Sequence, residues 1–463
     1  MKPNDLIIPI ALGLASCAPL PPRSRATPVL WRPHGAVLVG RAGTATPPLW
    51  WQAVGSAPLD ALVAAAIQGN PSLAVAEARV RAAAATLRLQ RGGRRLHISA
   101  AGRLTAEHFS QDGLHATANG QSVLYGEVDP LIARVHITHF GRIDDEVRAA
   151  FGGLQAVAAD RAEARLIVTT QIVRTYFAAE AARTERAYWH AMCRDAYRLL
   201  VLSRIRQRDG LSGARLVYAD EERLNVALQA YRKAATALVR LRNSLGALAG
   251  RGPAFERTVA LGALPAQTRL PLPSRISLAL VARRPDVLAA RRLLAVAAAR
   301  VGAARAAFYP DVNLVFFAGW NSISLRDLFD PVNLARAIGP TVSLPIFEGG
   351  TLRASLAKQE AVFVAARAQY QEALVAAVRE VADGVARLRQ VRHDLATQTK
   401  ALRAAQRQKA LAQQAFRAGL TDRAPLLQAD SVWWREQTRE VALRAAQATA
   451  WARIEGAIDG QAN

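Results

Sequence analysis

Residues 374–416 read LVAAVREVADGVARLRQVRHDLATQTKALRAAQRQKALAQQAF, and this stretch decides the fold. Every seventh residue from Leu374 is mostly large and apolar, and the set that starts three residues later is mostly small. The two sets are Leu374, Val381, Leu388, Leu395, Leu402, Lys409 and Phe416, and Ala377, Gly384, Val391, Gln398, Ala405 and Ala412. Such a heptad seam requires a helical neighbour at close approach. The helical pattern extends back to residue 351, which predicts a helix about 100 Å long.

The chain of 463 residues is strongly basic, with a formal charge of +24 from 60 basic and 36 acidic residues. Such a balance favours a polyanionic partner. The basic residues are, however, spread along expected helix faces, without a dense basic run and without the interleaved aromatic residues of single-strand binders. We therefore expect solvated helix faces and no nucleic-acid partner.

The N-terminus carries a short apolar run, residues 6–14, followed by Leu14-Ala15-Ser16-Cys17. The run is too short to span a bilayer and fits a secretory signal. Its ending resembles the bacterial lipobox, which implies a signal peptide at 1–16 and a lipidated mature N-terminus at Cys17. Ala18, in place of an Asp, favours the outer membrane. Residues 17–56, rich in Pro, Gly and Arg, are expected to form an extended tether.

Four segments alternate apolar and polar residues, as half-buried strands do. We expect strands at 96–107, 133–138, 312–320 and 338–346. The polar stretch before residue 133, which contains Gly126 and Pro130, is expected to be a loop.

The chain repeats itself at a spacing near 210 residues. Each half has the order helix, strand, strand, long helix, tip and return helix, with long helices at 142–209 and 351–416. The expected organisation is a first repeat at 57–250, a connector at 251–273, a second repeat at 274–459 and a C-terminal tail at 460–463.

The strands match those of outer-membrane barrels in length and alternation, but four strands cannot close a barrel, and an open edge is unfavourable in lipid. The chain must therefore pool strands with copies of itself. The expected fold is mainly α with a small membrane β part. Three tandem-repeat protomers would form a trimeric 12-stranded β-barrel continuous with a 12-helix periplasmic α-barrel.

Several motifs, in this order along the chain, resemble one family. They are Trp50-Trp51-Gln52, Asn70-Pro71-Ser72-Leu73, Arg283-Arg284-Pro285-Asp286-Val287, AARAAFYP at 303–310 and VSLPIFEGG at 342–350. On these residues the chain resembles the TolC family of outer-membrane channels, in the lipoprotein branch that serves tripartite efflux pumps. The loop 109–114, FSQDGL, also resembles a subgroup associated with export of fusaric-acid-like compounds.

The resemblance implies a passive exit duct for small toxic compounds or drugs. Its partners would be two further copies in a homotrimer, a periplasmic adaptor protein, an inner-membrane pump and outer-membrane lipid. The adaptor would dock at the two hairpin tips, which here are Gly210, Leu211 and Ser212, and Gly419, Leu420 and Thr421. A glycine at each tip also has a geometric reason, since a tight helix reversal favours positive φ.

A periplasmic gate is expected just after each tip, where family members commonly carry acids. The residues here are Asp220 in the first half and Arg423, Gln428 and Asp430 in the second. Pro425 and Gln428 stand where acids are expected, so a neutral or Arg-lined constriction is an alternative. Another is that Asp220 and Asp430 are ordinary exposed helix residues.

No segment suggests catalysis, a cofactor or a metal site. The glycine pairs lack the spacing of a phosphate-binding loop, and His136 and His139 would point to opposite faces of a strand. Three functional alternatives remain: a membrane-tethered coiled-coil scaffold with a small soluble β-domain, a basic nucleic-acid-binding helical protein, and an exit duct for type I protein secretion.

Overall fold

The structure is a computed structural model that describes residues 49–112, 119–138, 140–252, 255, 258, 260–262 and 281–458. The chain divides into two units, Met1–Gly35 and Ala36–Asn463. The first unit, with the predicted signal peptide and Cys17, lies outside the described residues. The elements of the second are η3 (Trp50–Val54), α1 (Ala57–Gly69), α2 (Pro71–Gly92), β1 (His97–His108), β2 (Ser122–Thr138), α3 (Arg142–Arg208), α4 (Ala214–Leu248), α6 (Pro285–Ala306), β3 (Asp311–Ser322), η5 (Leu325–Asp327), η6 (Pro331–Asn333), β4 (Leu334–Ser343), α7 (Thr351–Arg417) and α8 (Arg423–Ile458).

The two long helices, α3 and α7, end within one residue of the predicted positions. Each follows two residues with positive φ. These are Phe140 and Gly141, at 47° and 85°, before α3, and Gly349 and Gly350, at 58° and 88°, before α7. The left-handed pair turns the chain from strand into helix in both repeats. Phe140 adopts this unfavourable conformation while its ring stacks on Tyr309 with centroids 5.2 Å apart.

The heptad seam is buried where it was expected to pack. Its members Leu374, Ala377, Val381, Leu388, Val391 and Ala405 are buried. Helix α7 packs against α8 and α6. A Cβ at Gly384 would lie 3.0 Å from Cγ1 of Ile454 on α8, so the small residue permits close approach. Phe416, at the tip, is 38% exposed.

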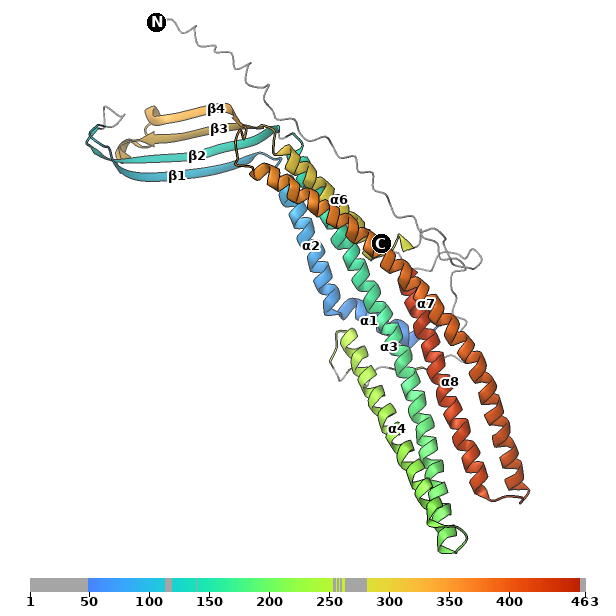
Figure 1. Cartoon of the computed structure of the whole chain (residues 1–463). Coiled ribbons are helices and arrows are strands. Elements are labelled where there is room, and N and C mark those ends of the chain that lie inside the picture. Colours follow the sequence, from blue (N-terminus) through green and yellow to red (C-terminus); the bar gives the residue numbers. More distant parts are fainter. Residues whose placement is uncertain are drawn as a thin grey trace. The chain divides into compact units, whose positions relative to one another are not determined.

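The four strands form one antiparallel sheet in the order β1-β2-β3-β4 (Figure 1), which leaves β1 and β4 as edges. Residues opposite one another share a face. The row Ile98, Ala133, Phe316 and Ile338 lies on the apolar face, and His97 opposite Arg134 lies on the polar face. This confirms the alternation.

Strand β2 begins at Ser122, eleven residues before the predicted start, so the expected loop before residue 133 is wrong. Pro130 sits where the pairing with both neighbours shifts register, between Ser99 and Ala101 on β1 and between Val128 and Leu131 on β2. A β-bulge accommodates a residue without an N–H donor. Pro130 therefore lies within strand β2 and does not end it.

Strand β4 occupies residues 334–343 and not 338–346. The strand stops before Pro345, and Ile346 and Phe347 are 93% and 89% exposed. The alternation of apolar residues thus continues past the last paired residue.

The predicted tether at 17–56 is wrong for its last part. Trp50 and Trp51 on η3 are buried in a core with Tyr176, Phe177 and Trp451. The ring centroids of Trp50 and Trp451 lie 5.3 Å apart. Burial of these aromatic surfaces fixes η3 on α3 and α8.

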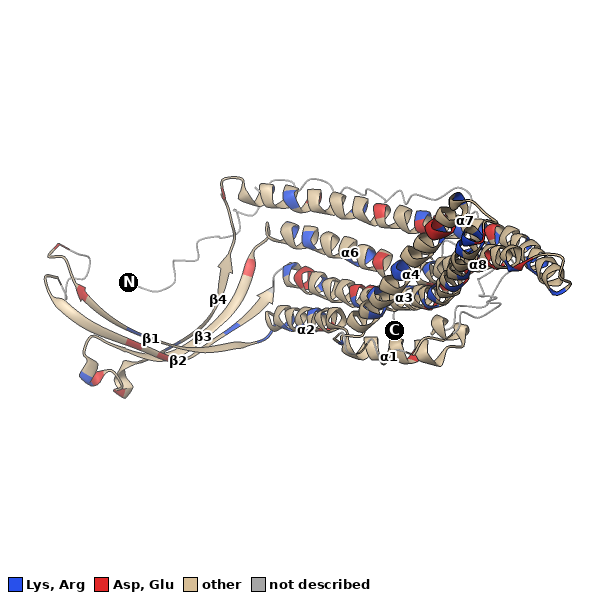
Figure 2. Ribbon diagram, turned by 90° about the horizontal axis from the view of Figure 1, so that it is seen from below, with Lys and Arg blue, Asp and Glu red and all other residues tan. Residues whose placement is uncertain are grey.

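Charged residues are frequent along the helices and sparse on the strands (Figure 2). In the described part of the chain no single helix is long and apolar enough to cross a membrane. Helices α1 and α2, which are bent by 45° at the break between them, together reach the length and the apolar composition of a membrane span. The sheet therefore differs in surface chemistry from the helices that precede and follow it.

Candidate functional site

The two hairpin tips have the same backbone geometry. Gly210 and Gly419 have φ of 70° and 73°. The N–H of Leu211 donates to the carbonyl of Arg206 at 2.7 Å, and that of Leu420 donates to Ala415 at 3.0 Å. Both reversals are Schellman-type helix ends, which favour a left-handed glycine. The geometric reason given for these glycines is confirmed.

The tips present apolar side chains to solvent: Leu211 and Leu420 are 77% and 78% exposed. Thr421 is also exposed and Ser212 is half-buried. An exposed Leu at both repeat-related positions offers two similar apolar points of contact.

Contacts connect the two hairpins close to their tips. Arg206 on α3 forms an ion pair with Asp422 before α8. Next to it, Leu199 on α3 packs with Ala424 and Leu427 on α8. The Asp422 carboxylate also accepts a hydrogen bond from the Ala424 N–H at 2.9 Å, so it both caps α8 and links it to α3.

The gate candidates lie in different environments. Asp220 is 3% exposed and forms an ion pair with Arg223 on its own helix. Asp430 is half-buried, with its carboxylate 2.9 Å from Nζ of Lys409. Arg423 and Gln428 are exposed. The alternative that both aspartates are exposed helix residues is wrong, because each is packed against a cation.

An aromatic cluster above the tips joins three helices, and sequence reasoning missed it. Nζ of Lys409 on α7 lies 3.9 Å from the ring centroid of Trp433 on α8. The neighbouring Trp434 donates from Nε1 to Asp195 on α3 at 3.2 Å. Asp195 is 3% exposed. A signal was present, since Lys409 occupies a core position of the seam, where a cation requires a specific partner.

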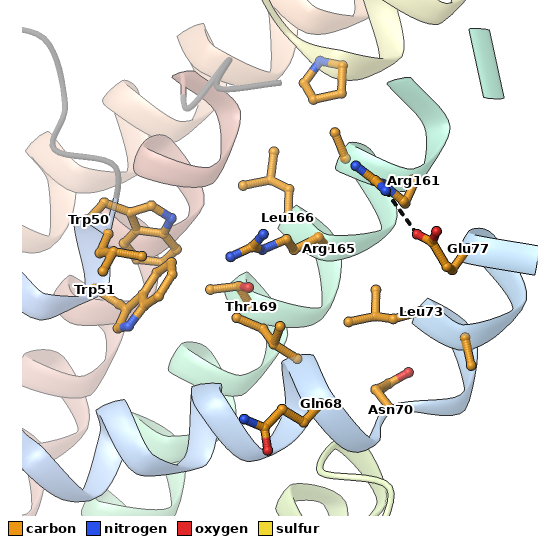
Figure 3. Close-up of a pocket in the computed structure, with 15 residues that line it drawn as sticks. Trp50, Trp51, Gln68, Asn70, Leu73, Glu77, Arg161, Arg165, Leu166 and Thr169 are labelled. Atoms are coloured by element: carbon orange, nitrogen blue, oxygen red, sulfur yellow. Dashed lines mark hydrogen bonds and ion pairs between the residues drawn. The ribbon is translucent and has the colours of Figure 1, made fainter. Parts of the chain in front are cut away.

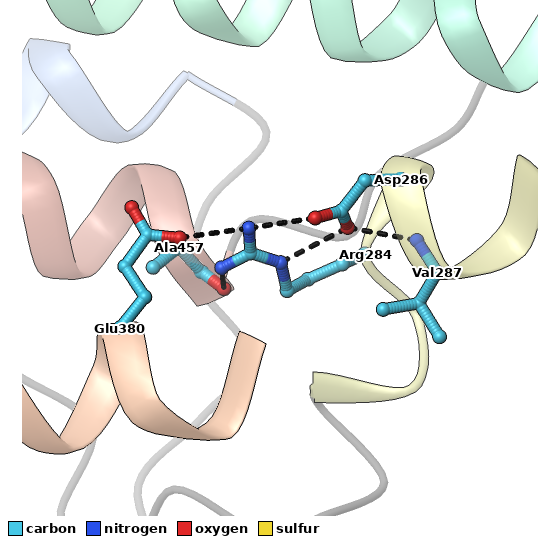
Figure 4. Close-up of polar contacts among 5 residues, drawn as sticks. All are labelled: Arg284, Asp286, Val287, Glu380 and Ala457. Atoms are coloured by element: carbon cyan, nitrogen blue, oxygen red, sulfur yellow. Dashed lines mark hydrogen bonds and ion pairs between the residues drawn. The ribbon is translucent and has the colours of Figure 1, made fainter. Parts of the chain in front are cut away.

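A second polar cluster explains the Arg-Pro-Asp motif at the start of α6 (Figure 4). Arg284, 7% exposed, donates to both oxygens of Asp286 at 3.0 and 2.9 Å, and its guanidinium lies 2.9 Å from Glu380 on α7. It also reaches the carbonyl of Ala457 on α8 at 3.4 Å. One guanidinium thus holds α6, α7 and α8 together.

Electrostatics in this cluster are tightly linked. Burial acts to lower the pKa of Arg284, but the hydrogen bond and charge of Asp286, together with Glu380, outweigh burial and raise it. On α3, burial and then the nearby charge of Asp286 raise the pKa of Glu163 to about 6. Three carboxyl groups therefore share one buried cation.

Comparisons with known proteins agree with this architecture. The family model for outer membrane efflux proteins matches residues 276–460. Multidrug resistance outer membrane protein MdtP of Escherichia coli strain K12 is 27% identical over 390 residues, or 81% of this chain and 78% of MdtP. Fusaric acid resistance protein FusA of Burkholderia cepacia is 28% identical over 318 residues, or 66% of this chain and 58% of FusA. The crystal structure of the outer membrane protein VceC from Vibrio cholerae matches with a TM-score of 0.80 at 27% identity, covering 90% of this chain and 100% of VceC.

The likeness covers both repeats and not only the segment that the family model matches. The VceC match spans nine-tenths of the chain, including sheet and helices. Residues 276–460 match the outer membrane efflux protein family, and the similarity to MdtP and VceC extends over most of the chain, which is an outer-membrane efflux channel, not an enzyme.

Proposed function

We propose that the chain is the exit duct of a tripartite efflux pump, which passively conducts small toxic compounds from a periplasmic adaptor and an inner-membrane pump to the outside. The observation that carries this proposal is the four-stranded sheet with two free edges and one apolar face, in which each pair of strands leads into a long helical hairpin. A membrane sheet of this kind is complete only when its edges are paired.

Three copies would satisfy both edges, with β4 of each copy pairing with β1 of the next. The product is a twelve-stranded β-barrel that continues into a cylinder of twelve helices. Twelve strands lie within the size range of outer-membrane barrels. Within one copy the helix pairs α2 with α3, α3 with α6 and α6 with α7 already lie side by side. These helices would be consecutive neighbours in the wall of such a cylinder.

The class of exported compound is proposed from the names of the relatives. MdtP is named for multidrug resistance and FusA for fusaric acid resistance. Small organic toxicants are the shared class, and they favour a drug-efflux duct over a duct for protein secretion.

The adaptor would dock at Gly210, Leu211 and Ser212 and at Gly419, Leu420 and Thr421. Exposed Leu211 and Leu420 support this, since an adaptor that covers them gains apolar burial. The gate would lie around Asp220, Arg423, Gln428 and Asp430. Because Asp220 and Asp430 are paired with cations, we propose a constriction that is not a free acidic ring.

The links between the hairpins would hold the tip closed in the absence of an adaptor. They are the Arg206–Asp422 ion pair and the hydrogen bond from Trp434 to Asp195. An adaptor that separates α7–α8 from α3–α4 must break both.

The anchor is a separate part of the proposal. Residues 1–16 would be the signal peptide and Cys17 the lipidated N-terminus of a tether that leads to η3, followed by repeats at 57–250 and 274–459. Palmitate labelling that disappears on Cys17→Ala tests this, and labelling that persists would refute it.

The duct is tested with Leu211→Asp and Leu420→Asp in a strain whose drug tolerance depends on this chain. We expect drug tolerance to fall while oligomers extracted from the outer membrane stay intact, because a charge at the tip disfavours apolar docking. Leu89→Asp, at a Leu that is 71% exposed on α2, a helix that carries neither tip, is the control. Normal tolerance in both tip variants would argue against docking there, and a water-soluble monomer would refute the duct.

A further inference from the structure

A cavity of about 550 Å³ lies between α1, α2 and α3, apart from the tips and the sheet (Figure 3). Its size is in the range of small-molecule pockets. Leu73 on α2, Leu166 on α3 and Trp51 on η3 contribute apolar wall. The cavity can therefore accept an apolar group of aromatic size.

The cavity contains an uncompensated positive charge. Arg161 and Arg165, one turn apart on α3, both line it. Arg161 is neutralised by Glu77 on α2, with Nη1 2.9 Å from the carboxylate. Arg165 is exposed at the mouth of the cavity, like Arg186 elsewhere on this helix, and has no ion pair or hydrogen bond with any residue in the described ranges. In Figure 3 its side chain lies among the lining residues, between Trp50 and Arg161.

The starts of two repeat-related helices line the same cavity, and only one of them is neutralised. At α6, Pro285 is followed by Asp286 in the first turn. At α2, Asn70 caps the helix through Ser72 N–H at 2.8 Å, but the first turn has no acid. The positive end of the α2 dipole therefore adds to the charge of Arg165.

A buried donor points to the same kind of ligand. Trp50 is 1% exposed, and its Nε1 has no hydrogen-bond partner among the described residues. Trp50 lines the cavity, and Figure 3 shows its indole nitrogen on the side of the ring that faces Arg165. An unpaired buried donor is unfavourable until it meets an acceptor.

From this arrangement we propose that the cavity binds a small organic anion, with its apolar body against Leu73 and Leu166 and its carboxylate or equivalent acid on Arg165 and on Trp50 Nε1, which a shift of the neighbouring side chains uncovers on binding. A neutral molecule of the same shape would leave the guanidinium and the indole N–H without a charged acceptor. Charge-assisted hydrogen bonds are about twice as strong as neutral ones. The acid group, more than the apolar body, decides binding.

The test uses the purified full chain as its detergent-extracted oligomer, with 2-naphthoate as the probe and uncharged 2-naphthamide as its isostere. Calorimetry should show saturable binding of the naphthoate, at least about tenfold tighter than the amide, as expected for hydrogen bonds to a charged group. The assay contains neither adaptor nor pump, so its result is independent of export.

Variants locate the site. Arg165→Gln should weaken naphthoate binding about tenfold or more, whereas Arg186→Gln, at an exposed arginine on the same helix, should leave it unchanged. Ala74→Phe fills the cavity without altering charge and should abolish binding. Equal affinity for acid and amide, unchanged affinity in Arg165→Gln, or no saturable binding to the wild-type protein would each overturn the proposal.

Discussion

Substitution of Arg284 by Gln removes the guanidinium that joins α6, α7 and α8. Its three charge-assisted contacts, two to Asp286 and one to Glu380, are 2.9 to 3.0 Å long, and the arginine side chain is only 9% exposed. Breaking a fully buried ion pair costs about 3–5 kcal/mol. Here Asp286 and Glu380 are 34% and 53% exposed, and water screens the charges left behind. We therefore expect the free energy of unfolding to fall by about 2–3 kcal/mol.

The neighbouring Arg283→Gln is the matched control, because Arg283 is exposed and precedes Arg284 directly. Urea unfolding of the purified oligomer, followed by circular dichroism, compares the two variants at neutral pH. A difference below about 0.5 kcal/mol, the usual effect of a surface substitution, would refute the reasoning.

Three further outcomes are expected. The pKa of Glu163 is raised from 4.5 to about 6, so between these pH values the folded protein keeps a proton that the unfolded chain has lost. The free energy of unfolding should therefore fall as pH rises from 4.5 through 6. Urea unfolding of Glu163→Gln should not show this decline. Gly319→Ala should reduce the fraction of intact oligomer on unheated gels, because the new Cβ would lie 2.6 Å from the Val128 carbonyl oxygen. Gly339→Ala is the control and should leave this fraction unchanged, because no atom lies within 4 Å of its new Cβ. Equal fractions in the two variants would contradict this reasoning. Trp434→Phe removes a hydrogen bond to a buried carboxylate, worth about 1.5–3 kcal/mol, and should raise the conductance of single channels in planar bilayers. Unchanged conductance would show that this contact does not restrain the tip.

The long helices were predictable because their signal is periodic and local. The seam in α7 specified both its length and its buried face, and the Gly motifs specified where the chain reverses. The four strands were recognised by alternation, but the start of β2 was missed. Pro130 is tolerated there only because a bulge lies on both sides, and a bulge depends on the neighbouring strands.

The contacts of the candidate gate were harder to predict. Asp195 and Trp434 are 239 residues apart, so their hydrogen bond has no local signature. Asp430 looked like a surface acid because its partner, Lys409, sits on the preceding helix. Lys409 itself was visible as a cation within an otherwise apolar set. An exception to a strong pattern was the best guide to a specific contact, but it did not name the partner.

The two free edges of the sheet have a consequence for how the protein reaches its membrane. Each unpaired backbone group costs several kcal/mol in hydrocarbon, so a single copy cannot enter the bilayer and wait for others. Under the proposed three-copy closure, insertion and association are one event, and its rate rises steeply with the concentration of chains. A copy with a damaged β1 or β4 edge would stall the two intact copies that join it. Such variants should therefore be dominant over the wild-type protein when both are made in one cell.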